Sequence, residues 1–107
     1  MRQSRMIWAG TPRRLPHGEV VLRQGDPATS LFLVTGGAVR LSSVTRDGRE
    51  VVVALLGAGD VFGESALLGR CSPVEARVVG QTDVVAIAIP VLRDVIERHP
   101  ATAEELL

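Results

Sequence analysis

The sequence contains one cysteine, Cys71, and no lysine, so all twelve of its basic residues are arginine. A single cysteine excludes an internal disulfide and suits a reducing compartment, and we therefore expect a cytoplasmic protein. Twelve acidic residues balance the arginines, which gives a formal net charge of zero. A neutral chain carries no overall electrostatic footprint for nucleic acid, and a genome composition bias explains the missing lysine more simply than a DNA-binding surface does.

The sequence also lacks a long apolar run. The two longest runs, Val51–Leu56 and Val84–Leu92, are far shorter than a membrane span, and Pro90 interrupts the second. Residues 1–11 contain no long apolar core, so no signal peptide is expected. These absences predict a protein that does not contact a membrane.

Catalytic and metal-binding sets of residues are missing as well. His17 and His99 are far apart, and Cys71 has no second thiol near it, which leaves no metal-ligand spacing. Glu64 and Glu75 have no partner base, and nothing resembles a catalytic dyad or triad. We therefore predict that the chain is not an enzyme and holds neither a metal nor a resident cofactor.

The composition that remains is typical of one globular domain over residues 1–107. Hydrophobic residues make up 46% of the chain and charged residues 22%, which is enough apolar material for one core. From residue 13 to residue 89, short runs rich in valine, isoleucine and leucine alternate with turn residues. The expected strands are Arg13–Leu15, Val20–Leu22, Leu31–Thr35, Ala38–Thr45, Glu50–Leu56, Val61–Phe62, Val74–Val79 and Thr82–Ile89.

Two dipeptides, Gly36-Gly37 and Asp47-Gly48, predict two-residue hairpin turns, because glycine adopts positive φ without steric cost. Many short strands joined by regular turns indicate a mainly β sandwich or a jelly roll. The pattern of strands and turns does not by itself choose between the two architectures.

After Ile89 the apolar spacing changes to that of a helix, which we predict over residues 90–99. Pro90 suits a first helical turn, and Pro100 ends the helix. Residues 101–107 resemble the opening of another helix, which the end of the chain cuts short. The apolar stripe of the first helix consists of Val91, Leu92, Val95 and Ile96.

One stretch in the second half of the chain has the build of an anion cradle. A short strand, Val61-Phe62, runs into Gly63-Glu64, one helical turn over Ser65–Leu68, and a loop that returns to β pattern at Val74. The start of a helix presents free backbone N–H groups and the positive end of the helix dipole, which suit a phosphate. The glutamate at its edge is placed to accept hydrogen bonds from a sugar hydroxyl.

This stretch resembles the phosphate-binding cassette of cyclic nucleotide-binding domains, particularly of the sensor domain of Crp/Fnr transcription regulators. The cassette motif is Phe62-Gly63-Glu64-x-Ala66-Leu67-Leu68 followed by Ala76-x-Val78, and the resemblance runs from about residue 14 to residue 100. It implies a jelly roll, also called a double-stranded β-helix or β-roll, over about residues 13–89 with short flanking helices. The other matching motifs are Gly18-Glu19-Val20-Val21, Arg23-Gln24-Gly25-Asp26-Pro27, Gly36-Gly37-Ala38-Val39, Asp47-Gly48-Arg49-Glu50 and Gly59-Asp60-Val61.

The resemblance assigns roles to two cassette residues, each with a plainer alternative. Gly63 matches the family glycine that lets the backbone approach the phosphate, and its alternative is a tight turn. Glu64 matches the glutamate that binds the ribose 2′-hydroxyl, and its alternative is a helix N-terminal acid held by local amides. The predicted ligand-binding residues are Phe62, Gly63, Glu64, Ser65, Ala66, Val74, Glu75 and Ala76.

The family arginine that neutralises the cyclic phosphate is missing. The family places it nine or ten residues after the glutamate, where this chain has Pro73 and Val74, with Glu75 next. A lost charged hydrogen bond costs roughly 1.5–3 kcal/mol, and like charges about 4 Å apart repel by about 4 kcal/mol at an effective dielectric near 20. Half-screened, the two effects would weaken binding by roughly 10²–10⁴-fold.

Neither nearby arginine is expected to replace the missing one. Arg70 is only six residues past Glu64, too near for the family's loop. Arg77 lies three positions beyond the expected site and, by strand alternation, shares a face with Glu75, so we expect these two side chains to pair.

We therefore predict the effector-sensing domain of a Crp/Fnr-type regulator, with a degenerate cassette that binds cyclic nucleotide weakly or not at all. Its effector would be another small molecule or none, and the full-length protein would be a homodimer that reaches DNA through a C-terminal domain absent here. The alternative is a functional module for cyclic AMP or cyclic GMP attached to an enzyme or transporter. A cupin-type jelly-roll enzyme would need a His/Glu metal set that the sequence lacks.

Overall fold

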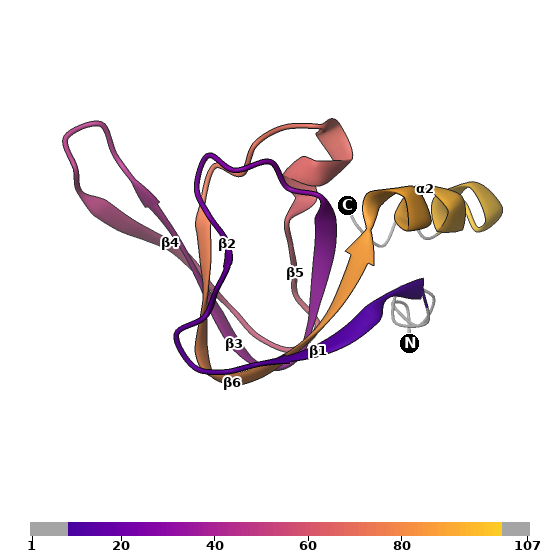
Figure 1. The fold of residues 1–107 in the computed structure, drawn as a ribbon, viewed down its shortest axis with the longest axis horizontal. Coiled ribbons are helices and arrows are strands. Elements are labelled where there is room, and N and C mark those ends of the chain that lie inside the picture. Colours follow the sequence, from indigo (N-terminus) through magenta and orange to yellow (C-terminus); the bar gives the residue numbers. More distant parts are fainter. Residues whose placement is uncertain (1–8, 102–107) are drawn as a thin grey trace.

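The computed structural model describes residues 9–101 of the 107-residue chain (Figure 1). It is a mainly β structure flanked by short helices, which confirms the predicted fold class. No helix within these residues is long and apolar enough to cross a membrane. The elements in chain order are β1 (Thr11–Leu15), β2 (Val20–Leu22), β3 (Ser30–Val44), β4 (Glu50–Leu56), β5 (Val61–Phe62), the 3-10 helix η1 (Glu64–Leu68), β6 (Glu75–Ala88) and α2 (Ile89–Arg98).

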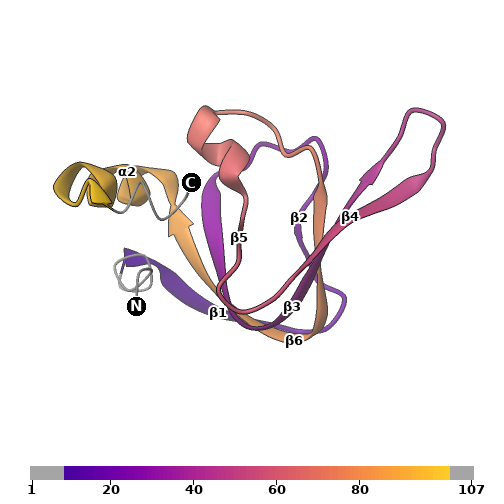
Figure 2. The ribbon, with the colours of Figure 1, turned by 180° about the vertical axis from the view of Figure 1, so that it is seen from behind.

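Two long strands, β3 and β6, organise the sheet. The strand order is β1-β6-β3-β4, with β2 also paired to β6 and β5 also paired to β3, and every pairing is antiparallel. Figures 1 and 2 show β3 and β6 curving together, so that the sheet rolls round its own inner face. The apolar side chains on that face form one core.

The predicted hairpin at Gly36-Gly37 is wrong, because β3 continues through both glycines as one strand. Its register against β6 shifts on either side of Gly36, as in a β-bulge. A Cβ atom at Gly37, whose φ is +86°, would lie 2.4 Å from Oγ1 of Thr82 on β6. That hydroxyl donates to the Ala38 carbonyl and accepts from the Ala38 amide, each at 3.1 Å. The glycines let β3 bend closely against β6 and do not reverse the chain.

Strand β6 likewise joins two runs that the sequence predicts as separate strands, Val74–Val79 and Thr82–Ile89. It begins at Glu75, and its last residue, Ala88, is the N-cap of α2. One continuous strand of this length can pair with β1, β2 and β3 along different parts of its course.

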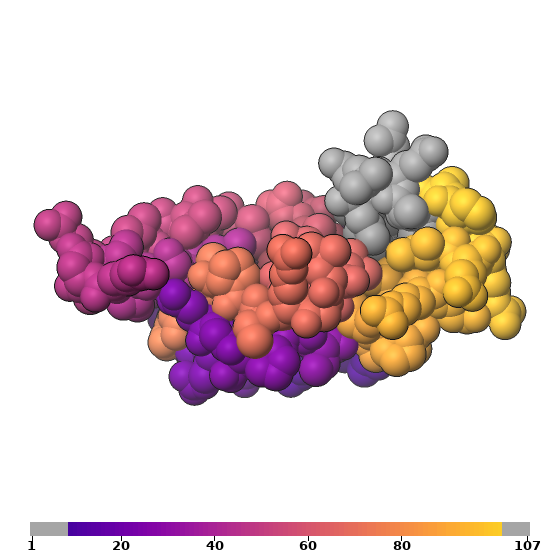
Figure 3. All heavy atoms as spheres, turned by 90° about the horizontal axis from the view of Figure 1, so that it is seen from above, coloured from indigo at the N-terminus to yellow at the C-terminus, as the bar shows by residue number. Residues whose placement is uncertain are grey.

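The hairpin at Asp47-Gly48 is confirmed, since β3 and β4 pair across it. Its turn is longer than the predicted two residues, because the Thr45 amide donates to the Arg49 carbonyl at 2.8 Å and the Gly48 amide donates to the Thr45 carbonyl at 3.0 Å. The paired strands extend beyond the roll, at the opposite end from α2 (Figures 1 and 3). Their apolar side chains are consequently exposed. The most exposed of them are Val44, Val52, Val53 and Leu55, at 53%, 57%, 57% and 66%.

Helix α2 closes the other end of the core, with Pro90 in its first turn, as predicted, and Arg98 in its last turn. Leu92 is fully buried and Ile96 packs against the core, whereas Val91 is 42% exposed, so the buried stripe is narrower than expected. The predicted helix over residues 101–107 lies almost wholly outside the described residues. The largest fully buried side chains are Phe62, Leu31, Leu33, Ile87, Leu92, Val34, Val39, Val78, Val84 and Thr82.

Candidate functional site

Strand β5 anchors the predicted cassette to the core. Phe62 is 1% exposed and pairs with Phe32 of β3, and their rings stack with 4.9 Å between centroids and 12° between planes. A buried aromatic pair fixes the point at which the chain leaves the sheet. The Phe62 ring therefore positions the cassette from within the core.

Gly63 follows at a point where only glycine fits. Its φ is +87°, and an added Cβ atom would lie 2.7 Å from the Ser30 carbonyl oxygen and 3.3 Å from the Phe32 ring. The left-handed turn and the close approach of the backbone to β3 both require glycine here. The tight-turn alternative accounts for Gly63 without a ligand, so the match to the family glycine is not independent evidence for a phosphate site.

Helix η1 is the predicted helical turn, in 3-10 form. The Ala66 amide donates to the Gly63 carbonyl at 3.1 Å, and Ala66 itself is buried, so the amides of Glu64 and Ser65 lie in the first turn. Glu64 is exposed, and its carboxylate has no hydrogen bond or ion pair within residues 9–101. Glu64 does lie in the first turn of η1, as the helix N-terminal alternative expects, but no local amide hydrogen-bonds its carboxylate within these residues, and the carboxylate faces solvent.

The loop after η1 is fixed by Ser72, a residue that the sequence analysis missed. Ser72 is 3% exposed; its amide donates to the Asp26 carbonyl and its carbonyl accepts from the Gly25 amide, both at 2.8 Å. Its hydroxyl donates to the Val74 carbonyl at 2.7 Å. A serine that bonds to the backbone two residues on forms a local turn, and Ser72-Pro73 was the available signal. The loop thereby fixes Val74, one of the two positions at which the family arginine is expected.

Strand β6 then separates the last predicted site residues onto opposite faces. Ala76 and Val78 are buried at 0% and 1% exposure, so alternation puts Glu75 and Arg77 on the outer face. Arg77 Nη2 lies 3.3 Å from Glu75 Oε1, which confirms the predicted pair, and Arg77 Nη1 donates to the Gly18 carbonyl at 3.1 Å. Arg77 is thus held away from the inner face, and Glu75 does not share the face of Ala76.

Arg70 differs from Arg77 in being unpaired. It is exposed, and its side chain has no hydrogen bond or ion pair to any other residue in the described part of the chain. Cys71 beside it is an exposed free thiol. Of the two arginines that the sequence offers as substitutes, Arg70 alone is free to move toward a ligand at the cassette.

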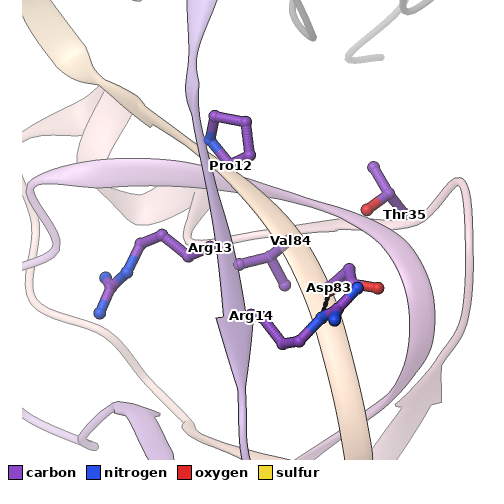
Figure 4. A pocket seen from close by; sticks show the side chains of 6 residues that line it. All are labelled: Pro12, Arg13, Arg14, Thr35, Asp83 and Val84. Carbon is purple, nitrogen blue, oxygen red and sulfur yellow. Dashed lines mark hydrogen bonds and ion pairs between the residues drawn. The ribbon is translucent and has the colours of Figure 1, made fainter.

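A cavity of about 470 Å³ lies against β1 and β6, and none of its lining residues belongs to the predicted site (Figure 4). Arg14 Nε donates to Asp83 Oδ1 across it at 2.9 Å, so the acidic group that lines it is already paired. Within residues 9–101, no three histidine, cysteine, aspartate or glutamate side chains gather to hold a metal ion. The cassette therefore remains the candidate ligand site. The residues that line the cavity are Pro12, Arg13, Arg14, Thr35, Asp83 and Val84.

The sequence model of the family described as "Cyclic nucleotide-binding domain" matches residues 12–99. This chain belongs to that family. The domain is 38% identical over 96 residues to the Cyclic AMP receptor protein of Thermus thermophilus, a match that covers 88% of this chain and 44% of that protein. The crystal structure of Thermus thermophilus catabolite activator protein matches it with a TM-score of 0.91 at 32% identity, over 98% of this chain and 50% of that one. The likeness to Crp/Fnr regulators is thereby confirmed.

A third relative of the cyclic nucleotide-binding domain is of another kind. Acetyltransferase Pat of Mycolicibacterium smegmatis is 38% identical over 74 residues, which cover 69% of this chain and 22% of that protein. The chain spans about half the length of the regulators it matches, at 44% and 50%, and a smaller part of the acetyltransferase. The relatives thus include both regulators and an enzyme.

Proposed function

We propose that this domain is the effector-sensing part of a Crp/Fnr-type transcription regulator, and that its cassette binds cyclic nucleotide weakly or not at all. The observation that carries the proposal is the identity of Pro73 and Val74, which occupy the positions of the family arginine. Arg77 does not replace it, because Glu75 and the Gly18 carbonyl engage its guanidinium on the outer face.

The outward position of Glu75 changes the expected size of the effect. Repulsion between Glu75 and a phosphate on the inner face drops out, and the lost arginine remains as the main deficit. A charged hydrogen bond worth roughly 1.5–3 kcal/mol corresponds to about ten- to two-hundredfold in affinity. The exposed Glu64 carboxylate and the first amides of η1 remain available, which supports residual binding over complete loss.

Calorimetric titration with cyclic AMP and cyclic GMP tests the proposal on three forms of the chain: the native sequence, Val74→Arg, and Val74→Arg/Glu75→Ser. We expect no tight binding by the native chain and a gain of about ten- to two-hundredfold in Val74→Arg alone. The double variant should add little, because Glu75 lies on the outer face. Micromolar binding by the native chain that Arg70→Ala abolishes would overturn the proposal and assign the phosphate to Arg70.

In this proposal the domain acts by shifting the equilibrium between two arrangements of the chain that follows α2. An effector shifts such an equilibrium only by its differential affinity for the two arrangements. The parent protein would be a cytoplasmic homodimer that contacts DNA through a separate C-terminal domain, and the effector would be a small molecule with weaker demands on a phosphate clamp.

A second candidate is a regulatory module attached to an enzyme, which the likeness to Acetyltransferase Pat favours. The sequence that follows Leu107 in the parent gene distinguishes the two candidates. A helix-turn-helix pattern supports the regulator, and an acetyltransferase or other catalytic domain supports the attached module.

A further inference from the structure

A second cleft lies on the outer face of the sheet, where β3 and β6 run side by side. Its volume is about 350 Å³, at the small end of the range for ligand pockets. Alternation separates it from the inner face, because the neighbours of Glu75 and Arg77 on β6 are buried in the core. The cleft is therefore distinct from the cassette. Its lining residues are Arg23, Gln24, Ser42, Val44, Glu50, Glu75 and Arg77.

Ser42 gives this cleft a polar group that no other described residue binds. Ser42 is 3% exposed and lines the cleft, and its hydroxyl has no hydrogen-bond partner among the residues that the structure describes. The buried side-chain atom without a partner in these residues is Nε of Arg40, so the Ser42 hydroxyl reaches solvent at the cleft. A polar atom bound in the cleft could take the place of the water at this hydroxyl.

The wall of the cleft is rigid where Ser42 sits. The Gln24 side-chain amide donates to the Val44 carbonyl at 3.2 Å and accepts from the Val44 amide at 2.8 Å, which pins the segment after β2 to β3. On the other side, Arg77 is held by Glu75 and by the Gly18 carbonyl. A site whose walls are already ordered loses little entropy when a ligand binds.

The charges that line the cleft are balanced: two arginines, Arg23 and Arg77, face two glutamates, Glu50 and Glu75. Arg23 is exposed and unpaired within residues 9–101, and Glu50 makes only a long contact of 3.8 Å with Arg40. A simple anion would meet both carboxylates, and a simple cation both guanidiniums. Arg77 and Glu75 already pair with each other, so a small molecule that carries one charge of each sign adds an anion for the unpaired Arg23 and a cation for Glu50.

We propose that this outer cleft binds a small zwitterion of the α-amino-acid class. Its carboxylate lies against the Arg23 guanidinium and the Ser42 hydroxyl, and its ammonium group faces Glu50 and Glu75. The proposal goes beyond the proposed function and does not depend on whether the cassette binds a nucleotide.

Two-dimensional ¹⁵N–¹H NMR spectra of the 107-residue chain test the proposal. The probes are L-alanine and L-glutamine, titrated into the millimolar range, with propionate and ethylamine as controls that keep one charge of L-alanine each. We expect saturable shifts of amide signals from the lining residues with the amino acids, and none from Gly63 to Ala66. Propionate and ethylamine should leave the spectrum unchanged at the same concentrations.

Two variants address the contacts. Ser42→Ala and Arg23→Gln should each weaken binding of the probe by about tenfold, and Arg93→Gln, an exposed arginine on α2, should not alter it. The same spectra report whether each variant is folded. The proposal is overturned if neither amino acid shifts the lining signals, if propionate shifts them equally, or if folded Arg23→Gln binds as the native chain does. Tight cyclic AMP binding at the cassette would refute the proposed function and leave this titration unaffected.

Discussion

The Arg77 guanidinium and the Glu75 carboxylate lie 3.3 Å apart on the face of β6 that looks away from the core. Arg77 also donates to the Gly18 carbonyl, so it connects the start of β6 to the segment before β2. Arg77, one of the two arginines close to the family position, therefore has structural partners of its own. Arg77 is therefore expected to contribute to the stability of the roll and not to ligand binding at the cassette, and the two roles can be tested separately.

Arg77→Gln should lower the free energy of unfolding by about 0.5–1.5 kcal/mol. The Arg77 and Glu75 side chains are 38% and 26% exposed, so solvent screens the ion pair and the bond to Gly18 supplies much of the effect. Urea denaturation measures the change, and Arg93→Gln, exposed and unpaired in the described residues, is a control expected within about 0.5 kcal/mol of the native chain. A folded Arg77→Gln that lost residual cyclic nucleotide binding would contradict this structural role.

Gly63→Ala should destabilise the chain more than Gly69→Ala. Both glycines have positive φ, which costs alanine about 1–2 kcal/mol, but an added Cβ at Gly69 meets no atom within 4 Å. At Gly63 the Cβ would approach the Ser30 carbonyl to 2.7 Å, which adds about 1–3 kcal/mol of steric cost. Denaturant unfolding of the two variants measures the difference. Equal losses would show that the backbone near Gly63 relaxes freely, against the close packing described above.

Phe62→Ala should cost about 3–5 kcal/mol in unfolding free energy, because it removes a fully buried ring from its stack on Phe32. Leu68→Ala, six positions along in η1 and 68% exposed, should change stability by no more than about 0.5 kcal/mol. Thermal or urea unfolding gives both values. A small loss for Phe62→Ala would mean that the cassette is not anchored through β5.

Thr82→Val should cost about 1–3 kcal/mol, because it leaves the Ala38 amide without its hydroxyl partner at the bend of β3. Thr82→Ser keeps the hydroxyl and removes a buried methyl group, which costs about 0.8 kcal/mol. Urea denaturation of the pair isolates the hydrogen bond from the packing. If valine proved as stable as serine, the hydroxyl would not hold the bend.

The strands that were predicted with their exact limits are β2, β4 and β5. Each is a short apolar run between glycines or polar turn residues, so local chemistry defines its ends. Gly36-Gly37 was misread for the opposite reason. Its role depends on Thr82, which is remote in sequence, and a glycine pair that permits a bend looks the same locally as one that makes a turn.

In the candidate site, too, features set by neighbouring residues could be predicted and features set by distant residues could not. Strand alternation was enough to predict that Arg77 pairs with Glu75, because the period of a strand is local. The buried serine at position 72 was missed, since its partners, Asp26 and Gly25, come from the distant segment after β2. The second cleft was missed too, because it joins residues from three strands, β3, β4 and β6, and the segment that follows β2.

The pairing of β6 also has a consequence for how the chain folds. Strands β1 and β2 have β6 as their partner in the sheet. Thr11, near the start of the described chain, pairs with Ala86, which comes near its end in the sequence. The entropy of closing such long loops is lost before most contacts between strands can form. We therefore expect the domain to fold slowly, on the millisecond-to-second timescale of all-β proteins. During synthesis, the first two strands must wait unpaired until β6 has emerged.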